Sequence, residues 1–169
     1  GCGAAMKEYG HLLRNDPQWA ERAQHFADSV FDVLEFVAEQ DFTPGLGTVD
    51  RTVTLQDACH LAHAQGIREA PRTILNAIPG LRLNELANPD RCCGSAGLYS
   101  AAQPEMSRSV LAAKMLEVEA TGADLIVTCN PGCTLQLETG VRDSKVSDAT
   151  VQHVIELLDA SYRAGDAAG

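Results

Sequence analysis

The chain has 169 residues and a mass of 18.0 kDa, a length that suits one domain with a substantial hydrophobic core. Hydrophobic residues make up 45% of the chain and charged residues 21%, which excludes a disordered, collagen-like or low-complexity polypeptide. The net charge of -10 argues against a nucleic acid partner, because a polyanion would be repelled.

The apolar stretches are all far shorter than the ~18 residues that a membrane span needs, and the chain does not open with a secretion signal. We therefore expect a cytoplasmic protein with no direct membrane span. Any association with the inner membrane is expected to be peripheral and to run through partner proteins.

The first part of the chain predicts helices. Residues 4–13 are expected to form a short helix. Asn15, Asp16 and Pro17 predict the cap and first turn of a long helix that runs to about residue 40, because apolar residues recur at every third or fourth position. A loop at residues 42–47 breaks this pattern. We therefore expect a helical segment over residues 1–47 that continues from a preceding repeat, and a second domain over residues 48–169.

From residue 48 onward, strands alternate with helices. Strands are expected at residues 53–55, 81–86 and 123–128, and helices at 66–78, 104–120 and 131–138, with Pro71 tolerated only in a first turn. A last amphipathic helix carries Val154, Ile155, Leu157 and Leu158, and residues 149–152 fit either a fourth strand or its first turn. The alternation predicts an α/β fold with a parallel sheet in three layers, similar to a Rossmann fold.

Five of the six cysteines come just after the expected strands. Cys59 follows the first strand, Cys92 and Cys93 follow the second, and Cys129 and Cys133 follow the third. Ligand crevices of parallel sheets form at the carboxyl ends of the strands, so we expect the five thiols to converge at one edge.

The chemistry of this cluster leaves three alternatives. Consecutive thiolates, as on Cys92 and Cys93, suit two iron atoms of one cluster better than a single tetrahedral ion. An iron–sulfur cluster is therefore favoured over a zinc ion and over a reversible disulfide. Cys129 and Cys133 flank the first turn of a helix that Asn130 caps, where the helix dipole is expected to lower a thiol pKa.

His60 and His63 flank the Cys59 loop. They either donate hydrogen bonds to cluster sulfur and tune its potential, or they hydrogen-bond to the backbone, and their spacing does not separate the two roles.

The cysteine motifs resemble a known family. The segments that carry the resemblance are Asp57-Ala58-Cys59-His60-Leu61, Cys92-Cys93-Gly94 and Cys129-Asn130-Pro131-Gly132-Cys133. This pattern resembles the cysteine-rich CCG domain that occurs twice in the B subunit of heterodisulfide reductase and also in iron–sulfur subunits of flavin-linked dehydrogenases. Residues 62–68 look most like the iron–sulfur subunit of glycolate oxidase. One departure is that three residues separate the last two cysteines, where heterodisulfide reductase usually has two.

The resemblance, which covers residues 51–160, implies a function. It implies a 4Fe-4S cluster, of the noncubane type in the heterodisulfide reductase members, bound by Cys59, Cys92, Cys93, Cys129 and Cys133. The domain would transfer electrons from a flavoprotein subunit that oxidises a 2-hydroxy acid such as glycolate, and would not be catalytic alone. The alternative is a zinc-binding structural or docking domain without redox activity.

The resemblance also bears on the start of the chain. Gly1-Cys2 is similar to Gly132-Cys133, so Cys2 is expected to be the last cysteine of a first CCG repeat. The remainder of such a subunit would add that first repeat and a ferredoxin-like domain.

Overall fold

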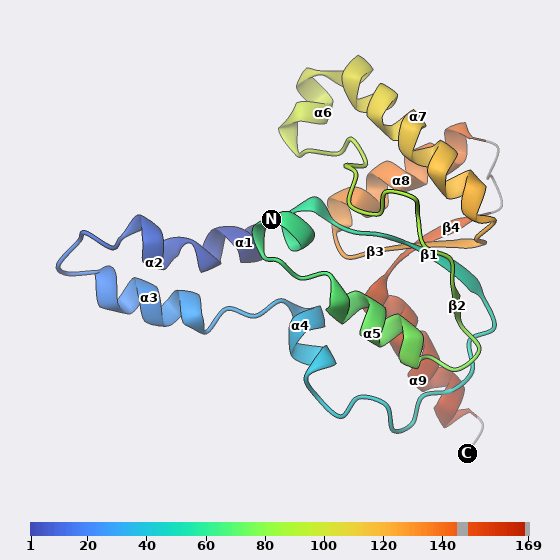
Figure 1. The fold of residues 1–169 in the computed structure, drawn as a ribbon, viewed down its shortest axis with the longest axis horizontal. Coiled ribbons are helices and arrows are strands. Elements are labelled where there is room, and N and C mark those ends of the chain that lie inside the picture. Colours follow the sequence, from blue (N-terminus) through green and yellow to red (C-terminus); the bar gives the residue numbers. More distant parts are fainter. Residues whose placement is uncertain (145–148, 168–169) are drawn as a thin grey trace.

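The protein, seen here as a computed structural model that describes residues 1–144 and 149–167, is built around a parallel β-sheet (Figure 1). In the described residues the strand order is β2-β1-β3-β4, and each neighbouring pair is parallel. The strands are β1 (Thr52–Gln56), β2 (Arg82–Leu83), β3 (Leu125–Thr128) and β4 (Thr150–His153).

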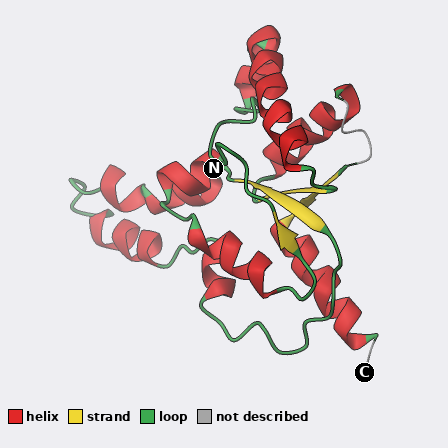
Figure 2. Cartoon of the chain, turned by 45° about the vertical axis from the view of Figure 1, so that its right-hand side comes forward, coloured by secondary structure: helices red, strands yellow, loops and turns green. Residues whose placement is uncertain are grey.

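Helices cover both faces of the sheet (Figures 1 and 2). The helices α5 (Glu69–Ala77) and α9 (Val154–Asp166) pack together on one face. The helices α7 (Pro104–Thr121) and α8 (Pro131–Asp143) pack together on the other. This arrangement confirms the expected three-layer α/β fold, because each crossover between parallel strands places a helix on the sheet.

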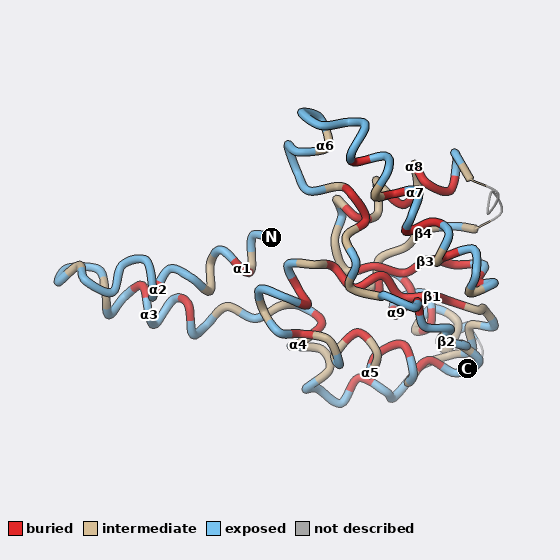
Figure 3. The backbone as a smooth tube through the Cα atoms, turned by 45° about the horizontal axis from the view of Figure 1, so that its top comes forward, coloured by how far each residue is buried: buried red, intermediate tan, exposed pale blue. Residues whose placement is uncertain are grey.

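The hydrophobic core sits on both sides of the two central strands. Val53 and Leu55 of β1, and Leu125, Ile126 and Val127 of β3, are almost completely shielded from solvent. Figure 3 shows that buried residues are concentrated in this region. Strands buried on both faces read as continuous apolar runs, which is why the sequence predicted β3 so clearly.

The amino-terminal segment contains four short helices, and the expectation of one long helix over residues 17–40 was wrong. The helices are α1 (Cys2–Lys7), α2 (Tyr9–Leu12), α3 (Ala20–Asp28) and α4 (Val33–Ala38). Helix α3 ends where the Ser29 hydroxyl donates to the Phe26 carbonyl at 2.8 Å. Asp32 then caps α4, because its carboxylate accepts from the Leu34 amide at 3.0 Å.

The break between α3 and α4 changes the shape of the molecule. Helix α4 packs against α5 through Leu34, which is fully buried. Helices α2 and α3 form a hairpin that extends away from the sheet (Figure 1). Periodicity alone could not find this break, since apolar residues occur at helical spacing on both sides of it.

The other differences from the expected elements are smaller. The second strand is limited to Arg82–Leu83, although the Asn84 amide still donates to the Val53 carbonyl of β1 at 2.8 Å. Helix α5 starts at Glu69 and holds Pro71 in its first turn, as expected, and α8 runs on to Asp143. The choice left open for residues 149–152 resolves as a strand, β4. The π-helical turn η1 (His60–Ala64) and helix α6 (Leu98–Ala102) were not expected.

The strand order contains one reversal of direction. The chain moves from β1 to β2 on one side, and then crosses over β1 to place β3 on its other side. Such a switch point, here between β1 and β3, leaves a crevice at the carboxyl ends of the strands. The segments that follow β1 and β3 therefore meet at this crevice. Within the described residues, no helix is both long and apolar enough to cross a membrane.

Candidate functional site

A cavity of about 230 Å³ lies at the carboxyl edge of the sheet and is lined by thiols. The structure brings together Cys59, Cys92, Cys93 and Cys133 around it, so the predicted convergence is confirmed for four of the five cysteines. The remainder of its wall is mostly backbone and small side chains: Gly1, Ala58, His60, Ser95, Ala96, Gly97, Asn130 and Gly132.

The fifth cysteine, Cys129, does not line this cavity. It is partly buried and packs against the hydrophobic core. Burial and the nearby carboxylates of Asp57 and Asp32 raise the pKa of its thiol. Cys129 therefore lies near Asp57 and Asp32, outside the cavity that the other four thiols line.

Backbone geometry brings the Cys92-Cys93 loop close to α7. Gly94 has a φ of +90°, and a Cβ atom there would lie 2.5 Å from the Ser107 carbonyl oxygen. The Ser107 hydroxyl donates to the Gly94 carbonyl at 2.8 Å, and the Gly94 amide donates to Cys92 Sγ at 3.3 Å. Only glycine fits this position, so the third residue of the Cys-Cys-Gly motif has a steric role.

The first turn of α8 presents Cys133 to the cavity. The Asn130 side-chain oxygen accepts from the amides of Gly132 at 2.9 Å and Cys133 at 3.3 Å. This confirms the expected cap with Pro131 at the first helical position.

Cys93 and Cys133 are both buried, and their thiols interact. A hydrogen bond from Cys133 lowers the pKa of Cys93 to about 6, against the opposing effect of burial, and the same bond raises the pKa of Cys133. The expectation that the helix dipole lowers the pKa of Cys129 and Cys133 was therefore wrong. Burial and nearby carboxylates raise the pKa of Cys129, Cys93 and burial raise the pKa of Cys133, and the stabilised thiolate is on Cys93.

The thiol of Cys92, which also lines the cavity, differs from that of Cys93 in the direction of its pKa shift. Burial and the neighbouring Cys93 and Cys59 raise the pKa of Cys92. His60 also lines the cavity, and its Nδ1 lies 3.9 Å from Cys59 Sγ. His63 takes a different place, with Nε2 at 3.6 Å from the Asp90 carboxylate, so only His60 is a candidate to contact a bound group.

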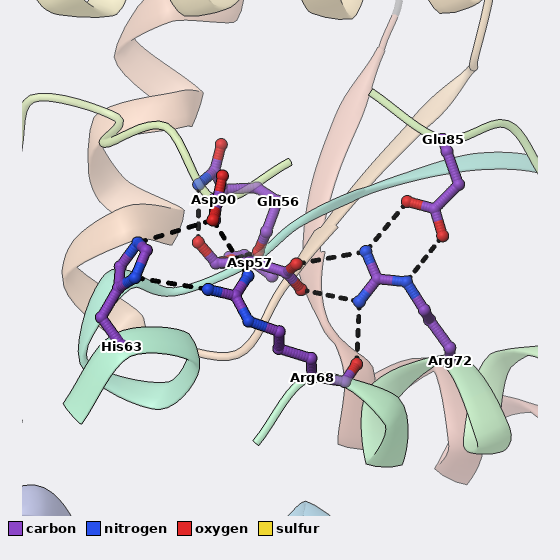
Figure 4. Close-up of polar contacts among 8 residues, drawn as sticks. Gln56, Asp57, His63, Arg68, Arg72, Glu85 and Asp90 are labelled. Carbon is purple, nitrogen blue, oxygen red and sulfur yellow. Dashed lines mark hydrogen bonds and ion pairs between the residues drawn. The ribbon is translucent and has the colours of Figure 1, made fainter. Parts of the chain in front are cut away.

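An ion pair behind the cavity anchors the end of β1 (Figure 4). Arg72 of α5 binds both carboxylate oxygens of the buried Asp57 at 3.1 Å and also binds both oxygens of Glu85. Burial opposes the charge on Arg72, but the bonds to Glu85 and Asp57 outweigh burial and raise its pKa. The pairing of Asp57 was not predicted from the sequence, because spacing does not reveal which cation reaches a carboxylate.

The same strand end holds the loop that carries Cys92 and Cys93. The Asp57 amide donates to the Pro89 carbonyl at 3.0 Å, and the Gln56 side chain donates to the Arg91 carbonyl at 3.1 Å. Arg68 binds the Asp90 carboxylate at 2.9 Å (Figure 4). The loop is therefore attached to β1 just before its cysteines.

The chemistry of the donor set fits a thiophilic group. Thiolates are the preferred ligands of iron–sulfur clusters and also bind zinc. Among the described residues, no three His, Cys, Asp or Glu side chains are placed as ligands of one metal ion, so the candidate ligands are assigned by which thiols line the cavity. A larger hollow of about 390 Å³ between α7 and α8 is lined mainly by apolar side chains and contains no cysteine.

The fold and the cavity together define a parallel α/β domain with a cysteine-lined crevice at its switch point. The chain matches the family described as cysteine-rich domain, CCG, over residues 53–138, and it belongs to this family. The matched region contains all five of the predicted site cysteines.

Similar proteins come from Bacillus. The chain is 42% identical to the probable glycolate oxidase iron-sulfur subunit of Bacillus subtilis over 162 residues, which are 94% of this chain and 36% of that protein. It is 31% identical to lactate utilization protein A of Bacillus cytotoxicus, covering 94% of this chain and 66% of that protein. It is 30% identical to lactate utilization protein A of Bacillus subtilis, covering 94% and 67%. The chain thus spans about a third to two thirds of the length of these relatives.

Changing Asp57 to Asn is expected to destabilise the domain. The substitution removes the buried charge that the half-buried Arg72 pairs with, while Arg72 keeps Glu85. The expected loss is about 2 kcal/mol, less than the roughly 3–5 kcal/mol of a fully broken buried pair. Urea unfolding measures it, with Asp50→Asn as the matched control, because Asp50 pairs with Arg82 on the open surface. Equal stability of the two variants would contradict a structural role for the buried pair.

Titration of the metal-free, reduced protein should reveal one early thiolate. Because the Cys133 hydrogen bond stabilises the Cys93 thiolate, one thiolate should form near pH 6 and persist at higher pH, as followed by its ultraviolet absorbance. Cys93→Ser should abolish this step. Cys133→Ala should move it to higher pH, since the donor is lost, and an unchanged midpoint in Cys133→Ala would refute the stabilisation of Cys93 by Cys133.

Proposed function

We propose that this domain binds an iron–sulfur cluster and transfers electrons within a flavin-linked 2-hydroxy acid oxidoreductase. The observation that carries the proposal is the set of four thiols, two of them consecutive in the chain, around one cavity at the switch point. Consecutive thiolates are poorly placed to bind one tetrahedral ion but are well suited to a polynuclear cluster.

The ligands that we propose are Cys59, Cys92, Cys93 and Cys133, with Cys129 as the fifth. Cys129 is included because it follows β3 and precedes the Asn130 cap of α8 by one residue, next to the turn that presents Cys133. The cluster that we propose is of the 4Fe-4S class, and its noncubane form is part of the proposal.

A bound cluster would supply one-electron redox chemistry, and the chain's own residues would hold and shield it. Gly97 and Gly132 line the cavity without a side chain, which leaves room for a bound group. Burial of Cys93 and Cys133 keeps water from the inner wall. Burial and hydrogen bonds to sulfur are the means by which proteins set the potential of such clusters.

The names of the relatives support the wider assignment. A probable glycolate oxidase iron-sulfur subunit implies a complex with a catalytic partner, and lactate is likewise a 2-hydroxy acid. We propose a flavoprotein subunit as the electron donor, because oxidation of a 2-hydroxy acid needs a two-electron acceptor.

Location and domain boundaries belong to the same proposal. We propose that residues 48–169 form the CCG domain, that residues 1–47 continue from a first CCG repeat, and that a ferredoxin-like domain belongs to the same polypeptide. We propose a cytoplasmic location, peripheral to the inner membrane through partners, because free thiols such as these six persist in a reducing compartment.

Anaerobic reconstitution with iron and sulfide should give a broad visible absorption that bleaches on reduction. Iron and sulfide content should fall sharply in Cys59→Ser and Cys93→Ser, because both thiols line the cavity. Cys2→Ser is the matched control, since Cys2 is exposed and is assigned to a neighbouring repeat. Cys129→Ser tests the fifth ligand, and unchanged iron content in that variant would remove Cys129 from the set.

Other outcomes of the same experiment are decisive. Stoichiometric zinc in protein from iron-replete cells, with no iron uptake on reconstitution, would replace the cluster by the zinc-binding structural domain. An iron loss in Cys2→Ser as large as that in Cys93→Ser would show that the boundary between the repeats is misplaced.

The isolated domain should oxidise neither glycolate nor lactate with any dye as acceptor. The expected reason is that it lacks the flavin that accepts the hydride equivalent. Turnover should appear only after a flavoprotein subunit of a glycolate oxidase is added, and reduction of the cluster should slow in Cys59→Ser. Turnover by the purified domain alone would overturn the assignment and would direct attention to His60.

A further inference from the structure

A buried lysine lies behind the Cys92-Cys93 loop. Lys114 is on α7, and its side chain is completely shielded from solvent. Burial of an ammonium group costs several kcal/mol unless partners compensate it. Burial accordingly lowers the pKa of Lys114, while Glu117 opposes this shift. The apolar side chains of the core cannot compensate the cost of burying this ammonium group, so its polar partners must do so.

The contacts of Lys114 lead to the cysteine loop. Its Nζ donates to the Asn88 carbonyl at 2.6 Å and lies 3.3 Å from the Glu117 carboxylate. The other oxygen of Glu117 accepts from the Asn88 side chain at 2.8 Å and pairs with Arg91 at 2.6 Å. Lys114 and Glu117 therefore bind both Asn88 and Arg91, and Cys92 directly follows Arg91 in the chain.

The contacts from Lys114 and Glu117 complement the hydrogen bonds that the end of β1 makes to the same loop. Gln56 and Asp57 bind the carbonyls of Arg91 and Pro89 from the strand side of the loop. Lys114 and Glu117 bind the same stretch from the helix side. The loop from residue 84 to residue 97 contains neither helix nor strand, so these side chains, together with the Asp57 amide, satisfy backbone groups that no regular element would satisfy.

The charge of Lys114 also acts on the cavity. Lys114 and Arg91 face a single carboxylate, Glu117, so this group carries a net positive charge. Lys114 attracts the Cys93 thiolate, which contributes to the lowered pKa of Cys93. Because Lys114 is buried, solvent screens its charge far less than it screens a surface cation.

We propose that Lys114 is a positioning residue for the Cys92-Cys93 loop and that its buried charge raises the reduction potential of the group held by these cysteines. The second half of this proposal rests on the proposed iron–sulfur function. A fixed positive charge near a thiolate-bound cluster favours the state that carries the additional electron.

Two substitutions separate the hydrogen bond from the charge. Lys114→Gln removes the charge and keeps a donor for the Asn88 carbonyl, whereas Lys114→Met removes both. Arg108→Gln is the matched control, because Arg108 is an exposed cation on the same helix. The measurements are iron and sulfide content, the midpoint potential in a dye-mediated spectroscopic titration, and amide hydrogen exchange of residues 88–93 in the metal-free protein.

The expected results differ for each variant. Lys114→Gln should keep its iron but show a more negative midpoint potential. Lys114→Met should bind iron roughly 10- to 100-fold more weakly, the usual effect of losing a group that orients metal ligands. Its amides at residues 88–93 should also exchange faster. Arg108→Gln should match the parent protein in all three measurements.

Each contrary result refutes one part of the proposal about Lys114. A parental midpoint potential in Lys114→Gln would refute the electrostatic role. Parental iron content and hydrogen exchange in Lys114→Met would refute the positioning role. If the parent protein bound no iron, the proposed function would fail, while the exchange rates of residues 88–93 would still decide whether Lys114 orders the loop. If Lys114→Met failed to fold, as judged by circular dichroism, exchange in Glu117→Gln would decide the same question, because Glu117 bonds to Lys114, Asn88 and Arg91: faster exchange at residues 88–93 would support the positioning role, and parental exchange would refute it.

Discussion

The site depends on one constraint: the loop between β2 and α6 must hold two adjacent cysteines in place although residues 84–97 contain no helix or strand. Side chains of the surrounding elements and the backbone amide of Asp57 supply the order. Asp57 and Gln56 hold the loop from the end of β1, and Lys114 and Glu117 hold it from α7. Loops ordered in this way by a rigid scaffold are common carriers of function.

The electrostatics of the crevice follow from the same groups. The protein has a net charge of -10, yet buried or half-buried cations gather behind the cysteines. Arg72 compensates Asp57 at the end of β1, and Lys114 contributes positive charge near Cys93. Thiolates in a crevice need such compensation, because desolvation otherwise keeps a thiol protonated, as it does at Cys129.

Much of the architecture was predictable from pattern. The apolar run of β3, the alternation of strands and helices, and the cap at Asn130 all identified elements that the structure contains. The long helix over residues 17–40 was not correct, because a hydroxyl on Ser29 and a carboxylate on Asp32 end one helix and start another without changing the apolar spacing. The length of β2 was overestimated: the strand ends at Leu83, and the Asn84 side chain bonds to α7, a contact that no local signal predicts.

The sequence by itself determined the fold class, the positions of five cysteines after three strands, and the chemistry that such thiols favour, since these follow from periodicity, residue type and the rule that parallel strands end at a common edge. Only the tertiary structure decided which thiols share a cavity, that Cys129 lies outside it, and that the stabilised thiolate is on Cys93. It also decided that Asp57 meets Arg72 and that Lys114 meets Asn88. The physical reason is that hydrogen bonds and ion pairs depend on distances of a few ångströms between residues far apart in the chain, and no spacing in the sequence encodes those distances.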